Sequence, residues 1–145
     1  MKLTKGNVFE HLDLDYICIT TNSILNKNGE LVMGAGVALE AKQRFPELPK
    51  VYGSKIEKMG LVGGEYFLLH HNNLIAFQTK IHYKDKSPID LVKKSVTRLK
   101  FLATLFDDCL FGLPLPAINN GGLTKEVVLP IIQSLPDNVL VFEKG

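Results

Sequence analysis

Short runs of consecutive apolar or β-branched residues recur along the chain. Most of them lack the strict apolar-polar alternation of a strand with one face in water, and this is typical of strands buried on both faces of a sheet. We therefore predict strands at Lys2–Thr4, Tyr16–Thr21, Tyr66–His70, Leu74–Thr79, Leu110–Leu113 and Val139–Phe142.

The clearest helix is predicted at Ile89–Phe106, where apolar residues recur at helical spacing. Ser87 is the expected N-cap, Pro88 the first helical residue, and Asp90 a favourable charge near the positive helix end. These three residues predict that the helix begins at Pro88.

Three further helices are expected between the remaining strands. One begins near Gly36 and is stopped by Pro46, and another spans Leu48–Met59. The last spans Thr124–Ser134. The residues expected to face the core are Val37, Ala38, Ala41 and Phe45 in the first helix, and Val127, Val128, Ile131 and Ile132 in the last.

The order of these elements is β, β, α, α, β, β, α, β, α, β, which indicates a three-layer α/β fold. The sequence has no internal repeat, low-complexity tract or evident linker. A single domain over residues 1–145 is therefore the prediction.

Composition and charge narrow the class of protein. The 145 residues are 46% hydrophobic and 22% charged, with a net charge of +2, so a disordered chain or a protein that coats polyanions is not expected. Cys18 and Cys109 lie in apolar runs and are expected to be reduced core residues. With no apolar leader or membrane-length stretch, the sequence predicts a cytoplasmic protein without membrane association.

Polar and glycine-rich segments follow several predicted strands, where ligands bind in open α/β sheets. Two of them, Gly34-Ala35-Gly36-Val37 and Asn119-Asn120-Gly121-Gly122, run into predicted helices. Such loops expose N–H groups in front of a positive helix end and suit a diphosphate. Each loop alone is better explained by glycines needed for a turn, and neither is a Walker A or dinucleotide motif.

Taken together, five segments resemble the macrodomains, which bind ADP-ribose. They are Gly6-Asn7-Val8, Thr21-Asn22-Ser23, Met33–Pro46, Gln78-Thr79-Lys80 and Pro116–Leu123. The Met33–Pro46 segment is similar to one branch in particular, which contains terminal ADP-ribose glycohydrolases, DNA ADP-ribosyl glycohydrolase antitoxins and ADP-ribose-1''-phosphate phosphatases. The resemblance implies a three-layer α/β/α macrodomain with a mixed, mostly parallel six-stranded sheet.

The resemblance also implies where ADP-ribose binds. Asn7 is expected near the adenine, Asn22 near the distal ribose, and the N–H groups of residues 34–37 and 119–123 at the diphosphate. Thr79 and Lys80 either line the crevice near the distal phosphate or ribose, or are an ordinary strand-terminal threonine and exposed lysine. Phe142 either stacks on adenine or belongs to the core. The expected binding residues are Asn7, Val8, Asn22, Met33, Gly34, Ala35, Gly36, Val37, Thr79, Pro116, Ile118, Asn119, Asn120, Gly121, Gly122, Leu123 and Phe142.

Lys42 is the catalytic residue that the resemblance implies, as an amine that attacks the anomeric carbon of the distal ribose. It borders the apolar side of its predicted helix, so we expect it to be partly desolvated, with a lowered pKa. The alternative is a surface lysine whose stem covers the core. The second loop lacks the aspartate of the terminal ADP-ribose glycohydrolases, so either the acid–base role falls elsewhere or the protein mainly binds.

The predicted function is hydrolysis that removes ADP-ribose from a protein, a nucleic acid or a small molecule. The alternatives are an ADP-ribose-1''-phosphate phosphatase, a non-catalytic ADP-ribose reader, and a module that binds proteins or nucleic acids. No cofactor is expected and, because the four histidines lack metal-ligand spacing, no metal. Nucleic acid is expected only as a modified substrate, and the protein is expected to be a monomer.

Overall fold

In residues 1–144, which the computed structural model describes, six strands form one sheet in the order β1-β6-β5-β2-β4-β3. Neighbouring strands are parallel except for β3 and β4, which are antiparallel. The predicted mixed, mostly parallel sheet is therefore confirmed. The strands are β1 (Lys2–Lys5), β2 (Tyr16–Thr21), β3 (Leu68–His71), β4 (Leu74–Gln78), β5 (Phe111–Pro114) and β6 (Val139–Glu143).

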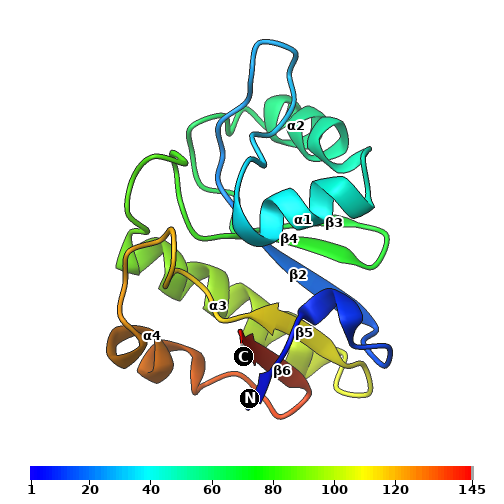
Figure 1. The fold of residues 1–145 in the computed structure, drawn as a ribbon, viewed down its shortest axis with the longest axis vertical. Coiled ribbons are helices and arrows are strands. Elements are labelled where there is room, and N and C mark those ends of the chain that lie inside the picture. The colour runs from blue at the N-terminus through cyan, green and yellow to red at the C-terminus, as the bar shows by residue number, and fades with distance from the viewer. Residues whose placement is uncertain (145) are drawn as a thin grey trace.

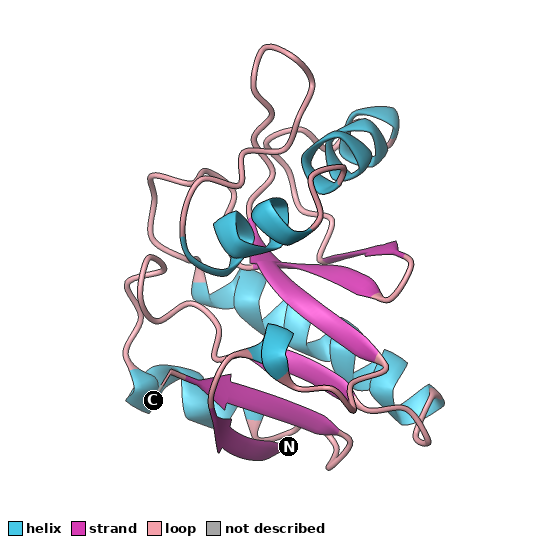
Figure 2. Cartoon of the chain, turned by 45° about the vertical axis from the view of Figure 1, so that its right-hand side comes forward, coloured by secondary structure: helices cyan, strands magenta, loops and turns pink. Residues whose placement is uncertain are grey.

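Helices cover both faces of this sheet (Figures 1 and 2). α1 (Gly36–Arg44) and α2 (Leu48–Lys58) lie on one face, and α3 (Ile89–Leu105) and α4 (Lys125–Ile132) lie on the other. A short 3₁₀ helix, η1 (Val8–Glu10), follows β1 and is an element that the apolar pattern does not predict. The predicted three layers and element order are otherwise confirmed.

Each face of the sheet has its own hydrophobic core, and β4 contributes to both. Ile75 and Phe77 pack in the core under α3 and α4, whereas Leu74 and Ala76 pack in the core under α1 and α2. All five residues of β4 are buried. A strand in this position needs apolar residues on both faces, which explains its unbroken apolar run.

The start of α3 differs from the prediction. Pro88, and not Ser87, is the N-cap residue, with φ −66° and ψ 128°, and no side chain caps the helix. The Ser87 N–H instead donates to the carbonyl oxygen of Gly121 over 2.8 Å. Because this bond ties Ser87 to the loop after β5, the helix begins at Ile89 and Pro88 lies just outside it.

The core-facing side of α4 is narrower than predicted. Val128 and Ile132 are fully buried, but Val127 is 39% exposed, so its assignment to the core was wrong. Thr124 caps the helix by accepting a hydrogen bond from the Val127 N–H, and this cap sets the helical phase. The prediction erred because several apolar residues follow one another in this helix, and their spacing alone does not show which of them point toward the sheet.

The connection from β2 to α1 is anchored on α2 at Gly53. A Cβ atom at this position would lie 2.1 Å from the carbonyl oxygen of Gly29. The N–H of Leu31 also donates to the carbonyl oxygen of Pro49, over 2.8 Å. The absence of a side chain at Gly53 therefore lets the connection lie directly on the helix.

We predict that Gly53→Ala destabilises the protein by about 1–3 kcal/mol, because the new methyl group overlaps a backbone oxygen that cannot easily move. This net value already includes the gain of about 1 kcal/mol that alanine brings inside a helix. Denaturant unfolding measures the change, with the exposed Lys58→Ala of the same helix as a control. A variant as stable as the wild type contradicts the close packing.

The carboxyl ends of the adjacent strands β4, β2 and β5 lie side by side at one end of the sheet. β2 lies between β4 and β5 and is parallel to both. After β2 the chain continues to β4 on one side of β2, and later to β5 on its other side. The strand order therefore reverses at β2, and the carboxyl ends of these strands form a topological switch point, where ligands bind in open α/β sheets. No helix in the described part of the chain is long and apolar enough to cross a membrane.

Candidate functional site

A cavity of about 720 Å³ opens at this switch point. Its walls come from the connections that follow β2, β4 and β5. The lining residues are Thr20, Thr21, Asn22, Val32, Gly34, Ala35, Gly36, Val37, Ala38, Thr79, Lys80, Tyr83, Lys84, Pro114, Leu115, Ala117, Ile118, Asn119, Asn120, Gly121 and Lys144. Ten of the predicted binding residues are therefore brought together here: Asn22, Gly34, Ala35, Gly36, Val37, Thr79, Ile118, Asn119, Asn120 and Gly121.

The loop before α1 forms one wall of the cavity. Within the described residues, the N–H groups of residues 34–38 have no hydrogen-bond acceptor. Gly36, the first residue of α1, has a φ of +56°, which a glycine adopts without strain. These free donors and the positive end of α1 together face the cavity and suit an anion.

The loop after β5 forms the opposite wall as a tight turn. The N–H of Leu123 donates to the carbonyl oxygen of Ala117 over 2.9 Å, and the N–H of Gly122 is shared by the carbonyl oxygens of Ile118 and Asn119. The predicted binding of a diphosphate by the N–H groups of residues 122 and 123 is therefore wrong, because the turn uses both. The N–H groups of residues 118–121 have no acceptor in the described chain.

At two glycines, neighbouring atoms lie close to where a side chain would begin. A Cβ atom at Gly121 would lie 2.4 Å from the carbonyl oxygen of Ala117, so the turn requires glycine there. A Cβ atom at Gly36 would lie 3.5 Å from Nδ2 of Asn120. The two walls therefore face each other across a short gap, with free N–H groups on both sides.

Lys80 is the buried lysine of the cavity, with 9% of its surface exposed. It follows β4 by two residues, and its Nζ donates to the carbonyl oxygen of Tyr83 over 3.2 Å. Burial lowers the pKa of the Lys80 amine, and the negative charge of Asp85 opposes this effect. A lysine in this environment supplies a neutral amine more readily than a solvated one.

Gln78 fixes the backbone from which Lys80 projects. Its Oε1 accepts from the N–H groups of Tyr66 and Phe67, at 2.7 and 3.1 Å. Its Nε2 donates to the carbonyl oxygens of Gly64 and Lys80, at 2.8 and 3.0 Å. Because these four bonds use both ends of a fully buried amide, the end of β4 is held in one conformation.

Asn22 lines the cavity, but most of its side chain is engaged elsewhere. Nδ2 donates to the carbonyl oxygen of Val32, and Oδ1 accepts from the N–H of Ile24, both over 2.9 Å. One amide hydrogen is left for a ligand. Asn22 thus mainly holds the connection after β2 in place, and its predicted role at the distal ribose stays a prediction.

Lys42 is exposed and is not among the cavity-lining residues, so the expectation that it is partly desolvated was wrong. The buried residues of α1 are Ala38 and Ala41. Lys42 is one residue past Ala41, about 100° further round the helix, and its flexible side chain reaches solvent from there. Expected burial was one reason for the predicted catalytic role of Lys42, but the buried lysine is Lys80.

Other predicted residues lie beyond the cavity lining. Asn7 caps η1 by accepting from the N–H of Phe9, and its Nδ2 donates to the carboxylate of Glu40 over 2.8 Å. Phe142 is 5% exposed and packs against the His11 ring in a T-shaped arrangement, with 5.6 Å between the ring centroids, which agrees with its core alternative. The remaining predicted residues outside the lining are Val8, Met33, Pro116, Gly122 and Leu123.

The sequence prediction placed Lys80 at the crevice, but it missed Tyr83, Lys84 and Lys144 and with them the basic character of the cavity. Lys80, Lys84 and Lys144 line it, and none of the lining residues in the described chain is an aspartate or glutamate. Tyr83 and Lys84 follow Lys80 in the segment directly after β4, and this position was the signal that could have found them. The described residues contain no group of three or more His, Cys, Asp or Glu placed to hold a metal ion.

Comparison with known proteins identifies the fold. No protein-family model matches the sequence. The chain is 27% identical over 134 residues to the DNA ADP-ribosyl glycohydrolases of Mycobacterium tuberculosis and Mycobacterium bovis. This match covers 85% of the chain but 38% of the length of each relative.

Solved structures cover almost the whole chain. The DarG macrodomain of Mycobacterium tuberculosis matches 99% of this chain and 97% of its own, with a TM-score of 0.77 and 23% identity. The DarG macrodomain of Thermus aquaticus matches the same shares, with a TM-score of 0.75 and 25% identity. DarTG of Thermosipho africanus, solved with ADP-ribose, gives a TM-score of 0.78 and 21% identity, over 99% of this chain and 41% of its own. The chain therefore has the macrodomain fold.

Proposed function

We propose that this macrodomain binds ADP-ribose in the cavity and hydrolyses the bond between its distal ribose and an attached group. The observation that carries the proposal is the buried amine of Lys80, inside a cavity whose two facing loops offer free N–H groups. The name of the curated relatives, DNA ADP-ribosyl glycohydrolase, supports the same reaction class.

The diphosphate is proposed to lie between the two loops. Residues 34–38 and residues 118–121 offer N–H groups that the described chain leaves without acceptors. Lys84 and Lys144 add positive charge to the same cavity, so binding draws on both dipoles and charged side chains. This arrangement fixes the sugar at one end of the ligand beside Lys80, which lowers the entropic cost of the reaction.

Lys80 is proposed to act as a nucleophile in its neutral form. Its Nζ forms a bond to the anomeric carbon while the bond from that carbon to the attached group breaks, and the leaving group takes the electron pair and a proton. Water then hydrolyses the sugar–lysine adduct, which releases ADP-ribose and restores the amine. Asp85, whose charge acts on Lys80, is the carboxylate we propose to exchange protons in these steps.

A non-catalytic reader is the second candidate, and a specific observation favours it. No carboxylate lines the cavity within the described residues, and Asp85 is exposed. A cavity with good anion-binding groups and a weak acid–base partner retains ADP-ribose without releasing the attached group. The proposals of a monomeric state and a cytoplasmic location are independent of this choice and stay predictions.

A panel of substrates tests the proposed function. The full chain is incubated with ADP-ribosylated DNA, ADP-ribosylated protein and ADP-ribose-1''-phosphate, and release of free ADP-ribose is measured. We expect turnover of ADP-ribosylated DNA. Calorimetric binding of ADP-ribose without turnover of any substrate establishes the reader instead, and turnover of ADP-ribose-1''-phosphate alone establishes the phosphatase. Absence of ADP-ribose binding contradicts the whole proposal.

The pH dependence tests the proposed coupling of Asp85 to Lys80. Activity requires the neutral amine, so kcat/KM rises with pH as Lys80 loses its proton. The Asp85 carboxylate favours the charged amine. We therefore expect Asp85→Asn to lower the pKa of Lys80 and to move the rising part of the profile to lower pH.

Asp90→Asn is the control for this measurement, because it removes an exposed carboxylate in the first turn of α3. A profile that keeps its position in Asp85→Asn contradicts the charge coupling. A rate that falls at every pH, together with the shift, assigns the proton-transfer role to Asp85 as well.

A further inference from the structure

A hydrogen-bonded turn lies at the rim of the cavity, between β4 and α3. We call residues His82–Asp85 the rim turn. The N–H of Asp85 donates to the carbonyl oxygen of His82 over 3.1 Å, and Tyr83 and Lys84 line the cavity from the middle of the turn. The rim turn is therefore an ordered wall of the site.

The Tyr83 ring is held in place while much of it stays accessible. Its centroid is 4.4 Å from that of the His82 ring, with 31° between the planes. The His82 ring is itself fixed, because its Nδ1 accepts from the N–H of Lys84 over 3.1 Å. Tyr83 as a whole is 41% exposed. An aromatic ring that is fixed but still exposed has a low entropic cost of binding.

The rim turn is also tied to the amine proposed to react. Nζ of Lys80 donates to the carbonyl oxygen of Tyr83 over 3.2 Å. Because Lys80 is buried and Tyr83 is exposed, the aromatic pair lies on the solvent side of the amine. With the distal ribose beside Lys80, as the proposed function has it, a group attached to that ribose leaves the cavity on the side of the rim turn.

We propose that Tyr83 is a specificity-determining residue that stacks on a nucleobase in the group attached to ADP-ribose. The inference rests on the proposed function and adds to it the residue that recognises the leaving group. A fixed, exposed ring among lysines is the arrangement that binds single-stranded nucleic acid, by stacking on bases and attracting phosphates. Lys84 lines the cavity beside the ring, and Lys86 lies exposed just beyond the rim turn.

A peptide as attached group fits this rim less well. Serine, threonine, aspartate and glutamate, as attachment points for ADP-ribose, offer no planar ring for Tyr83 to cover. The lysines would attract acidic peptides, but they cannot explain why an aromatic side chain is fixed at the exit. Recognition of a base accounts for the ring and the charges together.

The test compares two substrates in one set of variants. kcat/KM is measured for an ADP-ribosylated single-stranded oligonucleotide and for an ADP-ribosylated peptide. Tyr83→Ala is expected to lower the oligonucleotide-to-peptide ratio about 5- to 150-fold, the fold-change that corresponds to stacking on one base. The separate variant Tyr83→Phe is expected to keep the ratio within a few-fold of wild type, because stacking needs the ring and not the hydroxyl.

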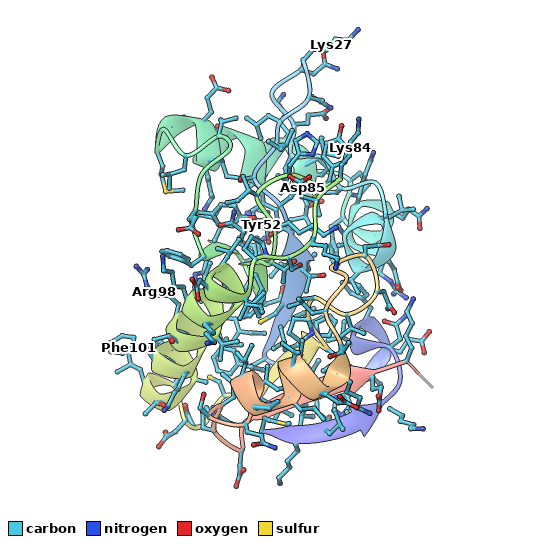
Figure 3. The ribbon with its side chains drawn as sticks, turned by 90° about the vertical axis from the view of Figure 1, so that its left-hand side faces the viewer. Lys27, Tyr52, Lys84, Asp85, Arg98 and Phe101 are labelled. Atoms are coloured by element: carbon cyan, nitrogen blue, oxygen red, sulfur yellow. The ribbon has the colours of Figure 1, made fainter. Side chains whose placement is uncertain are left out.

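Phe101→Ala is the matched control. Phe101 is 70% exposed on α3, and it projects from the outer side of that helix, away from Lys84 and Asp85 (Figure 3). We expect it to leave the ratio unchanged. A ratio in Tyr83→Ala equal to that of wild type overturns the proposal, whether both activities stay the same or fall together.

A binding measurement separates this proposal from the proposed function. If the wild-type protein turns over none of the substrates, fluorescence anisotropy gives the ratio of its affinities for the ADP-ribosylated oligonucleotide and for ADP-ribose. Tyr83→Ala is then expected to weaken oligonucleotide binding by the same factor relative to ADP-ribose. Equal weakening of both ligands, or of neither, rejects the stacking role even for a protein that only binds.

Discussion

Lys80→Ala is expected to lower kcat for release of ADP-ribose by about a thousandfold or more, while ADP-ribose itself binds within a few-fold of wild type. The reason is that Lys80 is the buried lysine of the cavity and the proposed nucleophile, whereas the loops proposed to hold the diphosphate do not involve its side chain. Single-turnover kinetics with the ADP-ribosylated substrate measure the loss, and calorimetry measures the binding.

Lys42→Ala is the matched control, since it removes a lysine from α1 that is exposed and outside the cavity lining. We expect it to keep activity close to wild type. Borohydride should trap a sugar adduct on the wild-type protein and on Lys42→Ala, and not on Lys80→Ala. The reverse pattern, with activity lost only in Lys42→Ala, would return the catalytic role to the helix lysine implied by the sequence resemblance.

The second large effect is expected for Gly34→Glu, which should weaken ADP-ribose binding at least a hundredfold in a protein that stays folded. A Cβ atom at Gly34 meets no atom within 4 Å, so the side chain is accommodated without distorting the loop. The new carboxylate then occupies the space in front of the α1 N-terminus and repels the diphosphate. Calorimetry measures the affinity, and thermal unfolding checks the fold.

Gln43→Glu controls for the change of charge alone, because both substitutions change the net charge by −1. It places a carboxylate on the same helix, at an exposed position outside the cavity. A comparable loss of affinity in both variants means that long-range charge, and not the position of Gly34, decides binding. Tight binding by Gly34→Glu places the diphosphate somewhere other than between the two loops.

The architecture was largely predictable because this sheet is buried on both faces. The apolar run of β4 contains the contacts of two cores, and such runs are visible in the sequence. The start of α3 was not predictable in the same way, because Ser87 bonds to Gly121, a residue far along the chain. Long-range hydrogen bonds leave no periodic signal.

The backbone of the candidate site was predictable, whereas the burial that distinguishes Lys80 from Lys42 was not. Glycine-rich loops before helices indicated the two walls, and both line the cavity. Lys42 and Lys80 differ in burial, and burial depends on which elements cover a residue in three dimensions. Helical spacing gives the direction in which the Lys42 side chain leaves α1, but it does not reveal that the end of β4 is enclosed around Lys80.

The placement of Lys80 on a different connection from the two loops proposed to hold the diphosphate has an evolutionary consequence. The loops follow β2 and β5, whereas Lys80 follows β4, and Gln78 holds its backbone independently of the lysine side chain. Under the proposed function, mutation at codon 80 removes the nucleophile without disturbing the groups that bind the ligand. A lineage with this layout could then pass in a single step from an enzyme that removes a modification to a protein that recognises it, with its affinity retained.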